Sequence, residues 1–445
     1  MRAPAAFLWV TAVVALAACD DASNSTASTS SSSGAGMSST ASASSAESTG
    51  SSTGSSMGGA GGAAGAPFTS KGASSYESQT TLAATPQGGV VAAWIAFFAD
   101  GTSSIGYAAS HDGGALWSAP RYVPAPGGRL TSNPVLAADS QGNFFLAFLG
   151  FLPSGAADDH IYVAKLVKGT DTFEAPHAAD TGAQRDYDKP SIAVDADDHV
   201  LLSWADFTGT PTLVFASSTD GVQFGTSTIA NDATFGNLAS LCLDRGAGPS
   251  APLYLVHLRQ GATLALRKST DHGQTWPLLA SVAPSDVVFQ DPSCAVHGAD
   301  VTVVYASGMA GVSATMNSPG TDVMVLASAD GGQSFAPPKS VGKVSPSDQV
   351  LFPRVARDTN GKLEIVFYEG VVDAPAKLVR ATSADGAAFQ LSQIAAPGTF
   401  TLDRTIASWL GDYIGVAAPT TGVLSSYADN GEGKAHIHFT AAGAP

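Results

Sequence analysis

The sequence predicts an all-β protein, a β-propeller of seven four-stranded blades. A short Ser-x-Asp-Gly turn, or a close variant, occurs five times in the 445 residues, each time followed by a Trp or Phe. A longer unit begins seven times, at intervals of 49 to 61 residues, and consists of an apolar stretch, a polar turn and a second apolar stretch. No long stretch has helical periodicity. Repeats of this length are typical of propellers, whose blades each need four short strands.

Residues 1–18 have the pattern of a signal peptide. Arg2 is followed by an apolar run that is too short to span a bilayer and that ends in Leu-Ala-Ala before Cys19. This ending resembles the bacterial lipobox, which implies cleavage before Cys19 and attachment of lipid to that residue. It also implies a place in the bacterial cell envelope, facing the periplasm or the cell exterior. The alternative is an ordinary secretory signal in which the cysteine occurs by chance.

Residues 19–65 follow as a tether. After the cysteine they are nearly all Ser, Thr, Gly and Ala, so they have no apolar surface to bury and are expected to be disordered. Such a segment is a flexible link between a lipid and a folded domain. The propeller domain is expected to occupy residues 66–445.

The repeat units account for this whole domain. They begin at Thr80, Pro134, Pro190, Ala239, Pro292, Pro353 and Asp412. Unit 7 stops one strand short, and residues 67–75 precede unit 1 without a blade of their own, so we expect an N-terminal strand to complete the last blade. Unit 2 is expected to be a degenerate blade, because Val167, Gly169 and Phe173 stand where the other units have Ser, Asp and an aromatic residue.

The five short turns are expected to be structural. They contain Asp112, Asp220, Asp271, Asp330 and Asp385. An Asp carboxylate in a turn accepts hydrogen bonds from nearby backbone amides, and glycine supplies the positive φ that a tight hairpin needs. The aromatic residue that follows can then pack between neighbouring units. These aspartates are therefore predicted to shape hairpins and not to catalyse a reaction.

The composition restricts the classes of function. The formal net charge is −16 and the pI is about 4.7, which argues against nucleic acid or anionic lipid as the main partner. The sequence has no phosphate-binding Gly-Lys-Ser/Thr loop, no paired-histidine zinc motif and no Gly-x-Ser-x-Gly elbow. We therefore expect neither a cofactor nor a metal.

Two features leave alternatives open. Cys242 and Cys294 lie in the inner strands of consecutive units, where they form either a disulfide between blades or two free buried thiols. Asp195, Asp197 and Asp198 form an acidic turn, which suits a calcium ion but more often is an ordinary polar turn.

Topology groups the polar residues that can share a site. If the strands of a blade are lettered A to D from the axis outward, the Asp turns lie between C and D. The B–C turns, and the crossings from D to the next A strand, lie on the opposite face. The crossings contribute Arg185, Tyr187, Asp188, Arg354, Arg404, Trp409, Asp412 and Tyr413, and the B–C turns contribute Asp206, Arg259 and Glu369. Aromatic rings, carboxylates and guanidinium groups suit a carbohydrate ligand. The alternative is that these residues are solvated or hold neighbouring blades together.

The Asp turns resemble the Asp box of sialidase-type β-propellers. Two phrases add to the likeness, Asp188-Lys189-Pro190 and the Trp-Leu-Gly-Asp-Tyr of residues 409–413, which are similar to segments of bacterial BNR-repeat proteins. The resemblance covers most of residues 66–445 and implies a glycoside hydrolase. In that family three arginines surround the carboxylate of sialic acid, a Tyr activated by a Glu is the nucleophile, and an Asp is the acid/base.

Carried onto this chain, the resemblance implies catalytic roles for Asp206, Glu369, Asp412 and Tyr413. It implies ligand binding by Arg185, Tyr187, Asp188, Arg259, Arg354, Arg404 and Trp409. Two departures stand beside it. The chain has seven units where classical sialidases have six, and unit 1 begins with Gln-Thr-Thr-Leu where the family has an Arg-Ile-Pro type of signature.

Two functions from different classes follow. One is a surface-tethered, sialidase-like hydrolase acting on glycans, and the other is a non-catalytic propeller that binds a glycan or a protein. The enzyme predicts arginines that converge on one point and a Tyr hydrogen-bonded to a carboxylate. The binding module predicts a mouth in which these residues pair separately with neighbours. In both cases we expect a monomer with a glycan or glycoprotein partner, and membrane contact only through the lipid anchor.

Overall fold

The computed structural model describes most of the predicted propeller domain. The described residues are 68–209, 211–229, 236–259, 263–282, 287, 290–308, 319–371, 374–394, 401–402, 409–419 and 423–442. The predicted signal peptide, the lipidation site Cys19, the tether and the candidate Arg404 lie outside them. Across the described part of the chain, no helix has both the length and the apolar character needed to cross a membrane.

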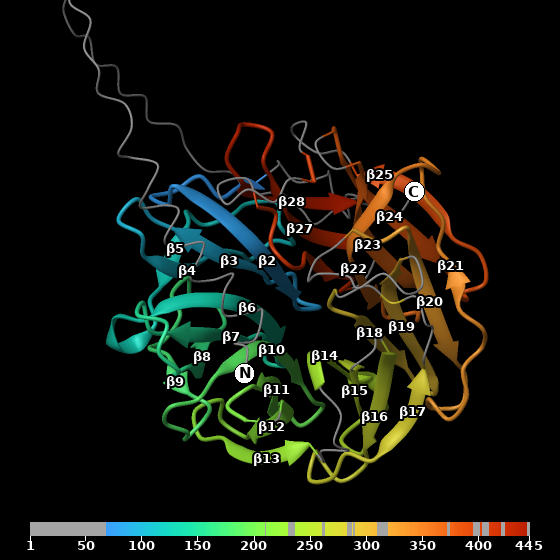
Figure 1. The fold of residues 1–445 in the computed structure, drawn as a ribbon, viewed down its shortest axis with the longest axis horizontal. Coiled ribbons are helices and arrows are strands. Elements are labelled where there is room, and N and C mark those ends of the chain that lie inside the picture. Colours follow the sequence, from blue (N-terminus) through green and yellow to red (C-terminus); the bar gives the residue numbers. More distant parts are fainter. Residues whose placement is uncertain are drawn as a thin grey trace, which may run out of the picture.

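The described residues form seven four-stranded antiparallel sheets, which confirms the predicted fold class. From the axis outward, blade 1 is β2 (Tyr76–Ala84), β3 (Val90–Phe97), β4 (Ser103–Ser110) and β5 (Arg121–Val123); blade 2 is β6 (Leu130–Ala138), β7 (Phe144–Phe151), β8 (His160–Leu166) and β9 (His177–Ala178); blade 3 is β10 (Tyr187–Val194), β11 (Val200–Asp206), β12 (Thr212–Ser218) and β13 (Gly225–Ile229); blade 4 is β14 (Gly236–Cys242), β15 (Leu253–Arg259), β16 (Thr263–Ser269) and β17 (Leu278–Val282). Blade 5 is β18 (Ser293–His297), β19 (Asp300–Ser307), β20 (Asp322–Ser328) and β21 (Lys339–Ser340); blade 6 is β22 (Gln349–Arg357), β23 (Leu363–Gly370), β24 (Lys377–Ser383) and β25 (Gln390–Ile394); blade 7 is β26 (Gly415–Ala417), β27 (Val423–Asp429), β28 (His436–Ala442) and β1 (Phe68–Thr69). Figure 1 shows these sheets arranged as a ring, with the inner strands around a central axis.

An N-terminal strand closes the ring, as the missing fourth strand of unit 7 predicts. In β1, Phe68 pairs with Phe439 and Thr69 pairs with His438 of β28. The Phe68 ring stacks on Trp117 of blade 1, with 5.0 Å between centroids. The chain therefore joins its first and last blades through both backbone and aromatic contacts.

The Asp turns are hairpins between the third and fourth strands. In blade 4, Ser269 Oγ donates to Asp271 Oδ1 (2.7 Å), and the Thr275 amide donates to the same oxygen (2.9 Å). Hydrogen bonds from the Thr275 side chain and backbone and from Ser269 lower the pKa of Asp271 to about 2. The following Trp276 is buried against Phe215 of blade 3, with ring centroids 5.1 Å apart. The aspartates thus shape the turns that direct an aromatic ring onto the preceding blade.

Blade 2 lacks this turn, as its sequence indicates. A backbone hydrogen bond from Thr170 to Val167 (3.0 Å) closes its hairpin without an aspartate. Phe173 still packs edge-on against Tyr107 of blade 1, with centroids 4.8 Å apart. The inter-blade contact is therefore retained although the Asp turn is lost.

A bulge interrupts the inner strand of at least five blades at the same place. The residue at the bulge has a positive φ of 50–55°, and these residues are Gln79, Asn133, Lys189, Leu238 and Phe352. In three blades a proline follows directly, which suits a position that has lost its ladder hydrogen bond. A bulge re-aims side chains, and here it lies in the innermost strand of each of these blades.

A disulfide joins Cys242 of β14 to Cys294 of β18, with the two Cα atoms 5.9 Å apart. Of the two alternatives that the sequence left open, the structure has the covalent bridge. It connects the inner strands of blades 4 and 5, which are separated by 52 residues in sequence.

Candidate functional site

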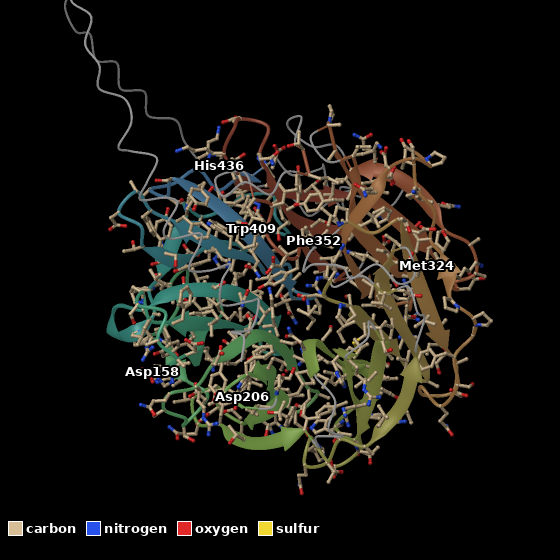
Figure 2. The ribbon with its side chains drawn as sticks, viewed as in Figure 1. Asp158, Asp206, Met324, Phe352, Trp409 and His436 are labelled. Carbon is tan, nitrogen blue, oxygen red and sulfur yellow. A yellow bond between two sulfur atoms is a disulfide. The ribbon has the colours of Figure 1, made fainter. Side chains whose placement is uncertain are left out.

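The second strands of the blades end on the face where the first strands begin, as the topology predicts. Strand register places Asp206, at the end of β11, opposite Tyr187, at the start of β10. Figure 2 shows Phe352, which belongs to the inner strand of blade 6, near the centre of the ring. Asp158, in the turn between β7 and β8, lies toward the rim. The face on which the first strands begin and the second strands end is called the mouth below.

Blade 3 contributes an ion pair to the mouth. Arg185 Nη1 lies 3.4 Å from Asp206 Oδ2, and the side chains are 43% and 14% exposed, respectively. The other oxygen of Asp206 accepts a hydrogen bond from the Thr208 amide (2.9 Å). Tyr187 is buried edge-on to Trp204, and this burial raises its pKa to about 12. Blade 3 thus presents a partly exposed guanidinium–carboxylate pair above a neutral phenol.

The bulges bring five polar side chains together beside the axis. Gln79 Nε2 donates to Asn133 Oδ1 (2.6 Å), and Asn133 Nδ2 donates to Asp188 Oδ1 (2.6 Å). Lys189 Nζ forms an ion pair with Asp412, and Gln79 Nε2 also reaches Asp412 Oδ2 (3.5 Å). All five residues are buried. This axial network links blades 1, 2, 3 and the start of blade 7.

Burial and charge determine the protonation states in the axial network. Burial raises the pKa of Asp188 to about 6, although Lys189 opposes the shift. Burial disfavours the charge on Lys189, but Asp412, Asp188 and Asp291 together raise its pKa above the usual lysine value. Lys189 is therefore charged at neutral pH, and its ion pair with Asp412 is shielded from water.

The structure separates Tyr413 from the carboxylate that precedes it. Tyr413 Oη donates to the backbone carbonyl of Pro134 (2.7 Å), while Asp412 pairs with Lys189. Burial raises the pKa of Tyr413 well above the ordinary phenol value. Arg354 lies over the Tyr413 ring, 5.1 Å from its centroid. Tyr413 therefore has the surroundings of a packed structural phenol.

Arg354 and Glu369 are each bonded to their neighbours. Arg354 Nη2 donates to Asp291 Oδ2 (3.0 Å) of the preceding blade. Glu369 is fully buried and accepts from the amides of Val344 (2.9 Å) and Ser345 (2.7 Å). Its carboxylate also lies 3.2 Å from Lys377 Nζ. Glu369 thus holds the loop that precedes β22.

The remaining described candidates, Trp409 and Arg259, belong to different parts of the ring. Trp409 is half-buried, and its carbonyl accepts a hydrogen bond from Ser78 Oγ (2.8 Å). Arg259 ends β15 opposite Gly236. Arg404 lies outside the described residues. Among the candidate arginines, Arg185 and Arg354 are bound to different carboxylates on different blades.

Tyr413, Tyr187 and Tyr76 each have a neighbouring carboxylate in the sequence that bonds to other residues. Besides Tyr413, the Tyr187 ring packs on Trp204, and Asp188 accepts from Asn133. Glu77, the neighbour of Tyr76, is fully buried and accepts from Ser70 (3.1 Å) and from His436. Figure 2 shows His436 at the outer part of the ring, well away from Phe352 at its centre.

The acidic turn of blade 3 is a polar turn. Asp195 Oδ1 accepts from the amides of Asp197 (3.0 Å) and His199 (2.9 Å), and Asp198 pairs with Arg245 (2.7 Å). Among the residues that the structure describes, no group of three or more His, Cys, Asp or Glu side chains is arranged to hold a metal ion.

Sequence reasoning missed Asn133 and the role of Gln79 in the axial network. Both have positive φ at the bulge, and neither carries a charge that would draw attention. The prolines at positions 134, 190 and 353 were the available signal, because each follows a bulge residue.

Comparisons with known proteins concern the fold. No protein-family model matches the sequence, and no curated protein matches it. Similar solved structures include the Hadza microbial sialidase Hz136 (13% identity, 83% of this chain and 66% of that chain, TM-score 0.49). A protein of unknown function from Dyadobacter fermentans (17%, 82% and 94%, 0.49) and a sialidase from Trypanosoma rangeli bound to the inhibitor DANA (13%, 70% and 55%, 0.48) are also similar. This chain spans 66% of the first and 55% of the last, and at these identities the likeness extends to the fold alone.

Proposed function

We propose that this protein is a non-catalytic propeller module that binds a glycan or a protein ligand at its mouth and is tethered to a bacterial cell envelope. One observation carries the proposal. The side chains that hydrolysis would use are committed elsewhere, since Tyr413 donates to the Pro134 carbonyl and Asp412 pairs with Lys189.

Physical chemistry supports binding over the sialidase-type reaction. A tyrosine nucleophile has to be activated by a base or by a lowered pKa. Burial does the opposite to Tyr413, whose pKa it raises. Its hydroxyl donates a hydrogen bond to the Pro134 carbonyl oxygen, which is too weak a base to accept the proton. Arg185 and Arg354 are held by separate carboxylates, so neither is available to share one ligand carboxylate without breaking an ion pair.

The partly exposed residues of the mouth suit a polar ligand. Arg185 and Asp206 offer donors and acceptors side by side at the end of blade 3. Trp409, half-buried on the crossing into blade 7, offers an aromatic ring. Sugars are bound by such combinations, because rings stack on sugar faces while charged groups hydrogen-bond to hydroxyls.

Envelope anchoring is the second part of the proposal. It rests on the lipobox-like ending before Cys19 and on the Ser/Gly/Ala-rich tether. Expression in a bacterium with a labelled fatty acid tests it. Label should enter the wild-type chain and disappear in Cys19→Ala. If both chains are labelled equally, or if the wild-type chain is secreted without label, lipidation at Cys19 is refuted. The N-terminal segment would then be interpreted as an ordinary secretory signal.

The experiment on function uses residues 66–445, which include all seven blades. Release of fluorophore from an α-sialoside and from a panel of other aryl glycosides is measured beside binding to an immobilised glycan array. We expect no turnover and saturable binding to at least one glycan class. Binding should weaken in Arg185→Ala and Trp409→Ala but not in Arg121→Ala. Arg121 is a matched control, because its side chain is 45% exposed and lies near a carboxylate, on the outermost strand of blade 1.

The outcomes separate the candidates. Turnover that disappears in Tyr413→Phe would overturn the non-catalytic proposal and restore the sialidase-like enzyme. If the folded protein shows neither turnover nor glycan binding, a protein ligand is the remaining candidate. Pull-down against envelope proteins is then the next assay.

A further inference from the structure

A set of hydrogen bonds holds the β7–β8 turn of blade 2 against the crossing into blade 3. The Asp159 amide donates to the Arg185 carbonyl (2.8 Å), and the Gln184 amide donates to Asp158 Oδ1 (3.1 Å). The Tyr187 amide donates to Asp159 Oδ2 (3.2 Å). These five residues are called the clasp. Since Arg185 and Tyr187 belong to it, the clasp fixes part of the mouth.

The two carboxylates of the clasp have opposite environments. Asp158 is partly exposed and forms an ion pair with Arg129 (2.6 Å), and hydrogen bonds from Arg129 and Gln184 lower its pKa. Asp159 is only 2% exposed. Its Oδ1 is buried and has no hydrogen-bond partner among the residues described around it. Asp159 is therefore a buried carboxyl with one oxygen unsatisfied.

The charges that act on Asp159 are mainly negative. Asp186 and Asp188, on the crossing and on β10, both disfavour its ionisation. Arg129 is the one positively charged residue among the main influences on the pKa of Asp159, and it already forms an ion pair with Asp158. Burial is the largest cause, and together with the neighbouring carboxylates it raises the pKa of Asp159 to about 7.

Other titratable groups of this region are paired among themselves. His160 Nδ1 lies 3.0 Å from Asp180 Oδ1, in the segment that follows β9. Arg185 pairs with Asp206. Asp206 in turn helps burial to raise the pKa of Asp186. None of these groups places a counter-charge on the free oxygen of Asp159.

We propose that Asp159 is a pH-sensitive lock on the mouth, whose neutral form keeps the clasp closed and whose ionised form loosens it. The geometry supports this because ionisation would leave a negative charge buried beside two further carboxylates, with one oxygen unpaired. Opening the clasp admits water to that charge. The lock itself needs no ligand, and its effect on ligand binding rests on the function proposed above.

The pH window follows from the raised pKa. In an open clasp the group returns to its ordinary value of 3.8, so the closed form binds the proton more tightly. The advantage of the closed form is complete below about pH 4. It then falls about tenfold per pH unit up to about pH 7 and is constant above that. Across the whole window the closed-to-open ratio decreases on the order of a thousandfold.

Hydrogen exchange in the full chain tests the lock. Protection factors of the Asp159 and Tyr187 amides, corrected for intrinsic exchange rates, are measured from pH 5 to pH 8. We expect them to fall with pH in the wild type and to lose this slope in Asp159→Asn, whose side chain stays neutral. Asp100→Asn is a control, since Asp100 is exposed and bonds within its own turn, and it should keep the wild-type slope. His160→Gln should also keep it.

Two outcomes would overturn the proposal. One is an equal pH slope in the wild type and Asp159→Asn. The other is a slope that is lost in His160→Gln, which would assign the effect to the histidine pair. If Asp159→Asn does not fold, Asp186→Asn replaces it. Removing that neighbouring charge should move the upper end of the window to lower pH, and an unmoved window would refute the lock. Because no ligand is present, these results do not depend on whether the mouth binds one.

Discussion

Removing the disulfide between blades 4 and 5 should lower the free energy of unfolding by several kcal/mol without unfolding the ring. Cys242 and Cys294 are 52 residues apart in sequence. In the chain-entropy description, closing a loop of that length lowers the entropy of the unfolded chain by about 14 cal/mol/K, which is about 4 kcal/mol at 25 °C. That contribution is absent once the bond is reduced.

The native contacts around the bridge explain why the ring should survive its loss. The Gly298 amide donates to Asp244 Oδ2 (2.6 Å), so the turns after the two inner strands remain joined. Farther out, Tyr254 Oη donates to the Gly331 carbonyl (3.2 Å) across the same two blades. Neither contact involves the sulfur atoms, so we expect both to persist after reduction. The expected effect therefore lies in the unfolded state, and the folded spectrum should be unchanged.

Guanidinium unfolding of residues 66–445, with and without reductant, measures this effect. Only two of the three cysteines lie in this range, so the reductant acts on one bond. The double variant Cys242→Ala/Cys294→Ala should match the reduced wild type to within about 1 kcal/mol and should not respond to reductant. The reasoning is refuted if reductant does not lower the guanidinium midpoint of the wild type, or if it still lowers the midpoint of the double variant.

Three further changes test the fold and the site. Phe68→Ala should cost about 2 kcal/mol, less than a full core Phe deletion because the ring is only partly buried on Trp117, and proteolysis should then cut first near residue 68. Tyr413→Phe should cost about 1 to 2 kcal/mol by leaving the Pro134 carbonyl unpaired, measured by thermal unfolding, and an unchanged stability would argue against that bond. Asp271 has a lowered pKa, so the stability that its ionised form gives to the folded state is present above about pH 4 and is lost toward pH 2. In an acid titration, the folded state of Asp271→Asn should therefore lose less stability than that of the wild type.

The architecture could be predicted because its signals are local and repeated. A turn such as Ser328-Ala329-Asp330-Gly331 needs only its own residues to fold, and it recurs at blade spacing. Counting the strands of each unit then shows that unit 7 lacks one strand, which the unassigned segment before unit 1 can supply. The degenerate turn at Val167 was visible for the same reason, since a repeat reveals where it is broken.

The pairings within the site could not be predicted in the same way. Lys189 and Asp412 are 223 residues apart, and their contact depends on how the ring closes. Proximity in sequence was also misleading. Tyr187 and Asp188 are successive residues of β10, and successive residues of a strand point to opposite sides. Asp412 and Tyr413, on the crossing before β26, also have different partners, since Tyr413 donates to the Pro134 carbonyl and Asp412 pairs with Lys189. A bulge with positive φ shifts this alternation further, and only the prolines that follow it indicate its position.

The energetics of the two ion pairs indicate where a ligand can act. Breaking a buried pair such as Lys189–Asp412, whose side chains are 5% and 10% exposed, by removing one partner costs about 3 to 5 kcal/mol. An exposed pair contributes only about 0 to 1 kcal/mol, and the Arg185 side chain is 43% exposed. A ligand can therefore displace the Arg185–Asp206 pair at little cost but gains nothing by competing for the axial network. We therefore expect the Arg185–Asp206 pair of blade 3 to be a part of the mouth that a ligand can engage, while the axial residues hold the blades in register.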